Sequence, residues 1–219
     1  MNESNTILLN ETELEPHWQM FVPKDNAIII QLGANNGKNC DEYGITDVVH
    51  SQSHLAILVE PLKKIFVDLV INYDNAKSRI HFENIAIVHD VGTGQAKLFI
   101  EGVDGIESSL VRRKPTTDSY DVVRLENFQY LIDKYRLTEI NAVFIDIEGL
   151  EYEVISDILL NCTVKPLMFR YEFTLSEYQQ ELDQILIDHG YVVKKDLTHG
   201  GDKIAVKREL YERFFIPEL

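Results

Sequence analysis

Acidic and amide side chains stand where the apolar runs of this sequence end. They are Gln31, Glu60, Asp146, Glu148 and Glu172. Carboxylates in such places can accept the hydroxyls of a ribose, hold a divalent cation or take a proton from a substrate. Because ligands of open α/β sheets bind outside the carboxyl ends of the strands, we expect these side chains to share one site.

Glu60 ends the apolar run 55–60 and is followed by Pro61, which we expect to begin a helix in its first turn. A carboxylate at the end of a second parallel strand can accept both hydroxyls of a ribose. The alternative is an acid that is favoured near a helix N-terminus by the helix dipole. We favour the ribose, because the acid is the last residue of the strand itself.

Asp146 and Glu148 are two positions apart on an expected strand over residues 142–149, so their side chains should point the same way. Asp146 could orient or deprotonate a substrate hydroxyl, with Glu148 and Glu172 in support. One of the acids could instead cap the helix that follows. Our expectation is a site without metal, and a Mg²⁺ ion between Asp146 and Glu148 is the alternative.

A glycine-bracketed turn follows the first apolar run, residues 27–32, which is typical of a buried parallel strand. The turn consists of Gly33, Ala34, Asn35, Asn36 and Gly37. Glycine allows a positive φ and a close approach of the backbone to a ligand. The turn lacks the middle glycine of the dinucleotide fingerprint, so a nicotinamide-dependent oxidoreductase is a disfavoured alternative, and a plain turn is another.

The elements that must position these residues alternate between strand and helix. We expect strands over residues 27–32, 55–60, 80–87, 95–101, 142–149, 167–172, 191–195 and 203–207. We expect helices over residues 41–51, from 61 onward, and over 122–135, 151–160 and 178–189. Such alternation predicts an α/β protein with a mostly parallel, doubly wound sheet. The short connection between the last two strands predicts an antiparallel hairpin.

Composition limits the function classes. The chain has 219 residues and a net charge of -15, which disfavours binding to nucleic acid or to an anionic membrane surface. Cys40 and Cys162 are far apart, and no signal peptide is recognisable, so we expect a cytoplasmic protein. We expect one domain over residues 27–208, a leader or lid over 1–26 and a tail over 209–219.

Six short segments stand in order between residues 27 and 207. They are residues 31–37 (Q-L-G-A-N-N-G), 59–61 (V-E-P), 82–87 (F-E-N-I-A-I), 108–110 (S-S-L), 145–151 (I-D-I-E-G-L-E) and 171–172 (Y-E). Together they resemble the motifs of the FkbM family of S-adenosylmethionine-dependent methyltransferases. The resemblance implies a Rossmann-like class I methyltransferase fold, with a seven-stranded sheet of order 3-2-1-4-5-7-6, an antiparallel C-terminal hairpin and helices on both faces.

The resemblance also implies roles for residues. Cofactor contacts would come from Gln31, Gly33, Ala34, Asn35, Asn36, Gly37, Glu60, Pro61, Asn84, Ile85, Ala86 and Asp146, with Glu60 on the ribose and residues 84–86 beside the adenine. Ser108, Ser109, Arg112 and Arg113 would contact the acceptor, although the basic pair could equally be a solvated loop.

The family mostly methylates hydroxyl oxygens, so the resemblance implies O-methylation of a sugar, a glycan or a small secondary metabolite. The oligomeric state stays open. Two departures bear on activity: Asn36 replaces a common Asp, and Phe173 stands where many members carry a His after the acid of the fifth strand. A cofactor-binding protein without catalysis is therefore the main alternative.

Overall fold

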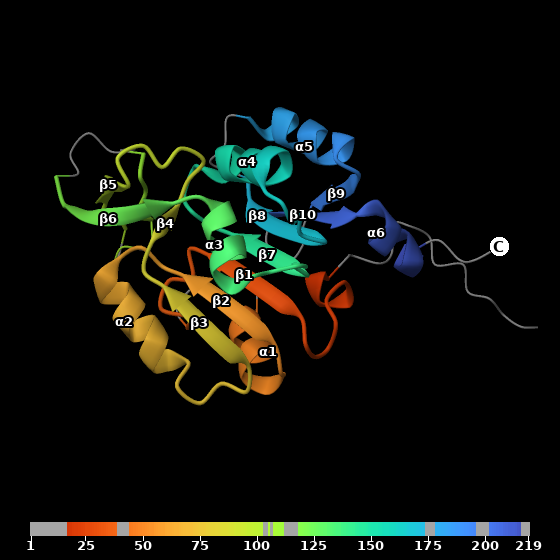
Figure 1. Cartoon of the computed structure of the whole chain (residues 1–219), viewed down its shortest axis with the longest axis horizontal. Coiled ribbons are helices and arrows are strands. Elements are labelled where there is room, and N and C mark those ends of the chain that lie inside the picture. The colour runs from red at the N-terminus through yellow and green to blue at the C-terminus, as the bar shows by residue number, and fades with distance from the viewer. Residues whose placement is uncertain are drawn as a thin grey trace, which may run out of the picture.

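The computed structural model describes residues 17–38, 44–102, 105, 107–111, 118–173, 178–195 and 202–215. Its central element is a seven-stranded sheet, drawn in Figure 1. The strands follow the order β3 (Arg79–Glu83), β2 (Leu55–Val59), β1 (Ile28–Leu32), β7 (Ala142–Ile145), β8 (Met168–Glu172), β10 (Asp202–Lys207) and β9 (Tyr191–Lys195). β10 runs antiparallel to β8 and β9, and the other neighbouring strands of this sheet are parallel. The predicted order and the C-terminal hairpin are confirmed.

Helices cover both faces of this sheet, because its central strands are apolar on both sides. One face packs against α3 (Phe128–Tyr135), α4 (Glu151–Asn161) and α5 (Gln179–Asp188). The other packs against α1 (Ile45–Ser51), α2 (Lys63–Asn72) and α6 (Arg208–Phe215). Each aliphatic side chain buried here contributes about 1.5–3 kcal/mol. This two-faced core fixes the strand ends that carry the acids.

A second, three-stranded sheet lies beside the carboxyl ends of the main strands, at the left of Figure 1. Its order is β4 (Ala86–Ile87), β6 (Tyr120–Glu126) and β5 (Gln95–Phe99). The helix predicted over residues 122–135 is wrong in its first half, where β6 lies. Val123 and Leu125 are buried whereas Val122 is 63% exposed, so the apolar pattern has a period of two. Asn127 then caps α3 by accepting the Tyr130 N–H at 3.0 Å.

The strand predicted over residues 80–87 is two strands in different sheets. The chain turns at Asn84, whose Nδ2 donates to the carbonyl oxygens of Glu60 at 2.8 Å and of Pro61 at 2.9 Å. Pro61 does not begin a helix, which corrects a second prediction. Oε1 of Glu60 accepts the N–H of Leu62 at 2.8 Å, and this turn delays α2 until Lys63.

The described part of the predicted leader packs onto the core. The one-turn helix η1 (Trp18–Met20) places Trp18 edge-on against Phe144 of β7, with ring centroids 4.8 Å apart. Phe21 contacts Phe214 and Phe215 of α6, within the stretch predicted as a tail. Among the described helices, none has the length and apolar character needed to cross a membrane.

Candidate functional site: a cleft between two loops

A cleft opens where β1, β2 and β7 end, between the main sheet and the small sheet. The space outside the protein atoms is about 790 Å³, including the solvent-open mouth. Ten of the predicted site residues line it: Gln31, Gly33, Asn35, Glu60, Pro61, Ile85, Ala86, Ser108, Asp146 and Glu148. The cleft therefore joins the predicted cofactor residues to two of the three predicted catalytic acids.

The glycine loop, residues 33–37, forms one wall. Its first residue, Gly33, has φ of +79°, and a Cβ built there would lie 1.8 Å from the carbonyl oxygen of Asp146. Gly37 has φ of +73°, and its Cβ would lie 2.3 Å from the Tyr73 ring. The first glycine thus allows contact between two loops, and the second allows packing on α2. Ala34, Asn36 and Gly37 support this loop from outside the residues that line the cleft.

Glu60 connects the ends of β1 and β2 from within the cleft. Its Oε2 accepts the N–H of Asn35 at 3.0 Å, while its Oε1 accepts the N–H of Leu62. Burial raises the pKa of Glu60 to about 7, and the two backbone N–H groups partly oppose that shift. A carboxylate can accept about four hydrogen bonds, so capacity remains for the hydroxyls of a ligand.

Asn84, predicted beside an adenine, lies outside the cleft lining, because its amide is bound to the Glu60 and Pro61 carbonyls described above. Ile85 and Ala86 do line the cleft, and they face an apolar set that the sequence did not identify: Val59, Leu62, Ile87, Leu98 and Leu110. This end of the cleft can receive a flat apolar group such as a purine base.

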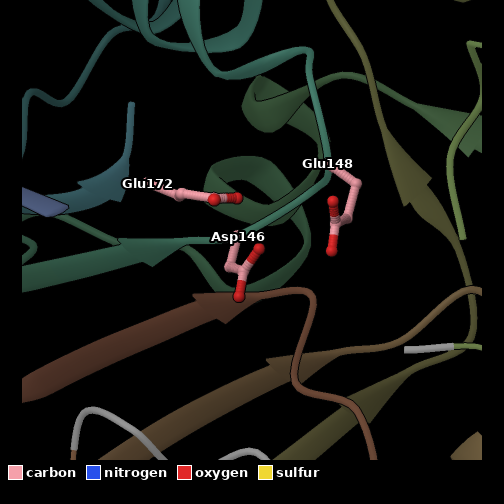
Figure 2. Close-up of side chains that lie close together, drawn as sticks. All are labelled: Asp146, Glu148 and Glu172. Atoms are coloured by element: carbon pink, nitrogen blue, oxygen red, sulfur yellow. The ribbon is translucent and has the colours of Figure 1, made fainter. Parts of the chain in front are cut away.

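Three carboxylates converge beyond the glycine loop, as Figure 2 shows. Asp146 and Glu148 follow β7, Glu172 is the last residue of β8, and oxygen atoms of all three lie within 4.8 Å of one another. Burial raises the pKa of Asp146 well above its usual value, and the nearby charges of Glu172 and Glu148 raise it further. A carboxylate with a raised pKa is a stronger base in its deprotonated form, which is the form that can accept a proton from a hydroxyl.

The predicted reason for this convergence is wrong, although the convergence itself is present. Strand β7 ends at Ile145, so Asp146 and Glu148 do not alternate along a strand. They belong to the acid loop, residues 146–149, in which Glu148 has a φ of +62°. A left-handed residue reverses the chain locally, and this turn, together with Asp146 at the strand end, brings the two carboxylates together.

The two serines differ in position. Ser108 lines the cleft, whereas Ser109 is 0% exposed and its Oγ donates to the carbonyl oxygen of Glu148 at 2.7 Å. Arg112 and Arg113 lie outside the described residues. Phe173 is partly buried against the core, and the Lys203 ammonium lies 4.5 Å from its ring centroid. An aromatic ring and a cation therefore occupy the neighbourhood where many relatives place a histidine.

Sequence reasoning missed one further acid, Glu151, which is 1% exposed at the start of α4. Its carboxylate accepts the N–H groups of Ile147 and Gly149, each at 3.0 Å. Burial raises its pKa to about 7. The signal was present, because Glu151 closes the I-D-I-E-G-L-E segment, but an acid in the first turn of a helix is also common for dipole reasons alone.

The model of the FkbM methyltransferase domain matches residues 31–193. Since this match spans most of the chain, the protein belongs to the FkbM methyltransferase family, as the sequence motifs predicted. It is accordingly an S-adenosylmethionine-dependent methyltransferase by family and by fold. A comparison with curated protein sequences finds no significant match.

Two solved structures are similar to this chain at low sequence identity. Fibrillarin of Aeropyrum pernix, crystallised with natively bound S-adenosyl-L-methionine, has 11% identity and a TM-score of 0.42, covering 84% of this chain and 67% of its own. Precorrin-6y C5,15-methyltransferase of Geobacter metallireducens has 13% identity and a TM-score of 0.46, with 92% and 93% covered. The assignment itself rests on the domain match and on the strand order of the sheet.

The residues of the cleft fit S-adenosylmethionine in chemical type. The apolar end around Ile85 and Ala86 suits a base, and the buried carboxylate of Glu60 suits ribose hydroxyls. The glycine loop brings backbone close to the far end of the cleft, which Asp146 also lines. Among the described residues that line the cleft there is no lysine or arginine.

Proposed function

We propose that this protein transfers a methyl group from S-adenosylmethionine to a hydroxyl oxygen of a sugar, a glycan or a small secondary metabolite. The observation that carries this proposal is the convergence of Asp146, Glu148 and Glu172 at the end of the cleft. The bound cofactor supplies an electrophilic methyl group, and the protein supplies alignment and a proton acceptor.

On the cofactor side, Glu60 would hold the ribose, Gly33 and Asn35 the methionine part, and Ile85 with Ala86 the adenine. Each of these residues lines the cleft. The loop is held before any ligand arrives, because Asn35 N–H is already bound to Glu60. Such preorganisation lowers the entropy lost on binding.

On the acceptor side, Asp146 is the proposed base. It would accept the proton that the acceptor hydroxyl loses as the new carbon–oxygen bond forms. The raised pKa of Asp146, caused by burial and by neighbouring carboxylates, makes it a stronger base than an exposed aspartate. Glu148 and Glu172 would accept hydrogen bonds from the acceptor and hold its hydroxyl in line.

A hydroxyl-bearing acceptor suits this cluster on chemical grounds. Ionised carboxylates are acceptors only, so they bind hydroxyl donors well and repel phosphates and acids. Ser108, which also lines the cleft, can add a hydroxyl contact. The described surroundings of the acids therefore favour a neutral polyol over an anionic acceptor.

The test is an acceptor panel with S-adenosylmethionine, in which formation of S-adenosylhomocysteine is measured for sugars, glycans, phenols and phosphorylated sugars. We expect turnover on a neutral hydroxyl compound. Asp146→Asn should lower kcat by about 10²- to 10⁴-fold with little change in cofactor affinity. Asp90→Asn, a change at an exposed Asp that does not line the cleft, is the matched control and should behave as wild type.

Two outcomes would change the proposal. The assay is run with and without EDTA, and we expect activity to persist, because Asp146 can act without a metal. Loss of activity with EDTA and recovery with Mg²⁺ would assign the carboxylates to a cation instead. Cofactor binding without turnover on any acceptor would favour a protein that has kept the pocket and lost the chemistry.

A further inference from the structure

The peptide bond between Glu148 and Gly149 is held at both of its polar ends. Its carbonyl oxygen accepts a hydrogen bond from Oγ of Ser109 at 2.7 Å. Its N–H donates to the carboxylate of Glu151, at 3.0 Å to Oε2. The two partners come from different parts of the fold, since Ser109 pairs with β5 of the small sheet and Glu151 begins α4.

Such a double anchor is needed because the backbone here is in an unfavourable conformation. Glu148 has a φ of +62°, which for a residue with a Cβ costs about 1–2 kcal/mol. A left-handed non-glycine residue persists only where the surroundings fix it. Two hydrogen bonds to one peptide are sufficient to offset a strain of this size.

The Ser109 side chain is itself fixed. It is 0% exposed, its Oγ accepts the N–H of Val111 at 3.0 Å, and its backbone exchanges two hydrogen bonds with Phe99 at 2.9 and 3.1 Å. A side chain so enclosed cannot touch an acceptor in this structure. The acceptor contact predicted for Ser109 from the sequence is therefore absent, and its hydroxyl bonds the Glu148 carbonyl instead.

We propose that Ser109 and Glu151 are positioning residues that clamp the Glu148–Gly149 peptide and thereby direct the Glu148 carboxylate into the cleft. We call this arrangement the peptide clamp. The effect of the clamp on catalysis rests on the proposed function. Its effect on the conformation of the acid loop does not. Through Ser109 the clamp also ties the small sheet, which carries the apolar end of the cleft, to the acid loop.

The structural test is amide hydrogen exchange measured by NMR on the full chain. In Ser109→Ala the Glu148 carbonyl loses its donor, so the peptide can turn and the Gly149 amide should exchange at least about tenfold faster. Glu151→Gln keeps one acceptor oxygen for Ile147 and replaces the Oε2 that accepts the Gly149 N–H, so the Gly149 amide should exchange faster by a similar factor. Ser156→Ala removes a buried hydroxyl that has no hydrogen-bond partner among the described residues and should leave these amides protected.

The functional test is a double-mutant cycle with Glu148→Ala, using an acceptor from the panel above. Ser109→Ala alone should lower kcat about tenfold and leave the KM for S-adenosylmethionine within about twofold. In the Glu148→Ala background the same change should have no further effect on kcat, because Ser109 acts through Glu148.

Separate results would overturn separate claims. Unchanged exchange of the Gly149 amide in both Ser109→Ala and Glu151→Gln would remove the clamp itself, whatever the enzyme does. Accelerated exchange with fully additive kcat effects would leave the clamp in place and remove its positioning role. Failure to find an acceptor would affect the proposed function alone, since the exchange experiment needs none.

Discussion

In each of the two loops that border the cleft, a buried carboxylate accepts hydrogen bonds from backbone N–H groups. In the glycine loop the carboxylate of Glu60 accepts the N–H of Asn35, and in the acid loop the carboxylate of Glu151 accepts those of Ile147 and Gly149. Burial raises the pKa of each carboxylate to about 7. Each loop thus depends on one buried acid for its shape.

The difference lies in where the two acids stand. Glu60 lines the cleft, so it can both hold its loop and contact a ligand. Glu151 lies behind its loop at the start of α4 and is absent from the cleft lining. A buried acid in a sequence motif can therefore shape a site without touching what binds there. Mutating the two acids distinguishes the roles of the two loops.

The largest effect is expected where the loops touch. Gly33→Ala would place a Cβ 1.8 Å from the backbone oxygen of Asp146, so both loops must move. We expect a loss of more than about 3 kcal/mol in the free energy of unfolding and no cofactor binding. Gly94 has nearly the same φ, +78°, with nothing within 4 Å of its Cβ. Gly94→Ala should therefore lose only about 1 kcal/mol.

Denaturant unfolding of the two variants measures this difference directly. Equal destabilisation would mean that the loops separate at no cost, and the contact between them would then have no structural role. Calorimetry with S-adenosylhomocysteine adds the second readout. Gly94→Ala should bind that compound as the wild type does.

The next largest effect is a difference in ligand affinity between variants of Glu60 and Glu151. Glu60→Gln should weaken S-adenosylhomocysteine about 10- to 100-fold, because ribose hydroxyls lose a charged acceptor. Glu151→Gln should change the same affinity by less than about threefold, since its side chain lies outside the cleft. Isothermal titration calorimetry makes the comparison. Similar losses in both variants would contradict the division of roles between the loops.

The smallest effect is a pH dependence of binding. Glu60 has a native pKa raised to about 7, so below that pH it is largely protonated and accepts ribose hydroxyls poorly. Affinity for S-adenosylhomocysteine should rise about tenfold from about pH 6 to about pH 8 and level off above. In Glu60→Gln this rise should be reduced. A profile identical in both proteins would assign the dependence to another group.

The same pKa has a consequence for stability, with the opposite sign. A carboxyl whose native pKa lies above its unfolded value stabilises the fold most when protonated. That contribution is complete below the unfolded pKa of about 4.5 and is lost as pH rises through about 7. Glu60→Gln should therefore gain stability relative to wild type between those values, as thermal unfolding at several pH values would measure.

Much of the fold was predictable, because the deciding signals are local. Apolar β-branched runs such as Ile28–Leu32 indicate buried parallel strands, and the short final connection indicates the hairpin. The small sheet was not predictable in the same way. In its strand β6 the exposed Val122 interrupts the alternation of apolar and polar residues, so the period of two is visible only once the burial of Val123 is known.

The candidate site was also predictable only in part. Gly33, Glu60 and Asp146, which line the cleft, were predicted as site residues from strand ends and motifs. Contacts between distant segments were not predicted: Leu98 reaches the cleft from the small sheet, and Ser109, expected to contact the acceptor, instead bonds the Glu148 carbonyl across 39 positions of the chain. Hydrogen bonds between distant segments leave no periodic trace in a sequence.

The central claim is that the cleft holds S-adenosylmethionine with its ribose on Glu60 and its reactive end toward the acid loop. A crystal structure of the complex with S-adenosylhomocysteine tests this most directly. We predict ribose hydroxyls within hydrogen-bond distance of the Glu60 carboxylate, adenine between Ile85 and Leu98, and the sulfur facing Asp146. A ligand bound elsewhere, or a ribose that does not meet Glu60, would contradict the account.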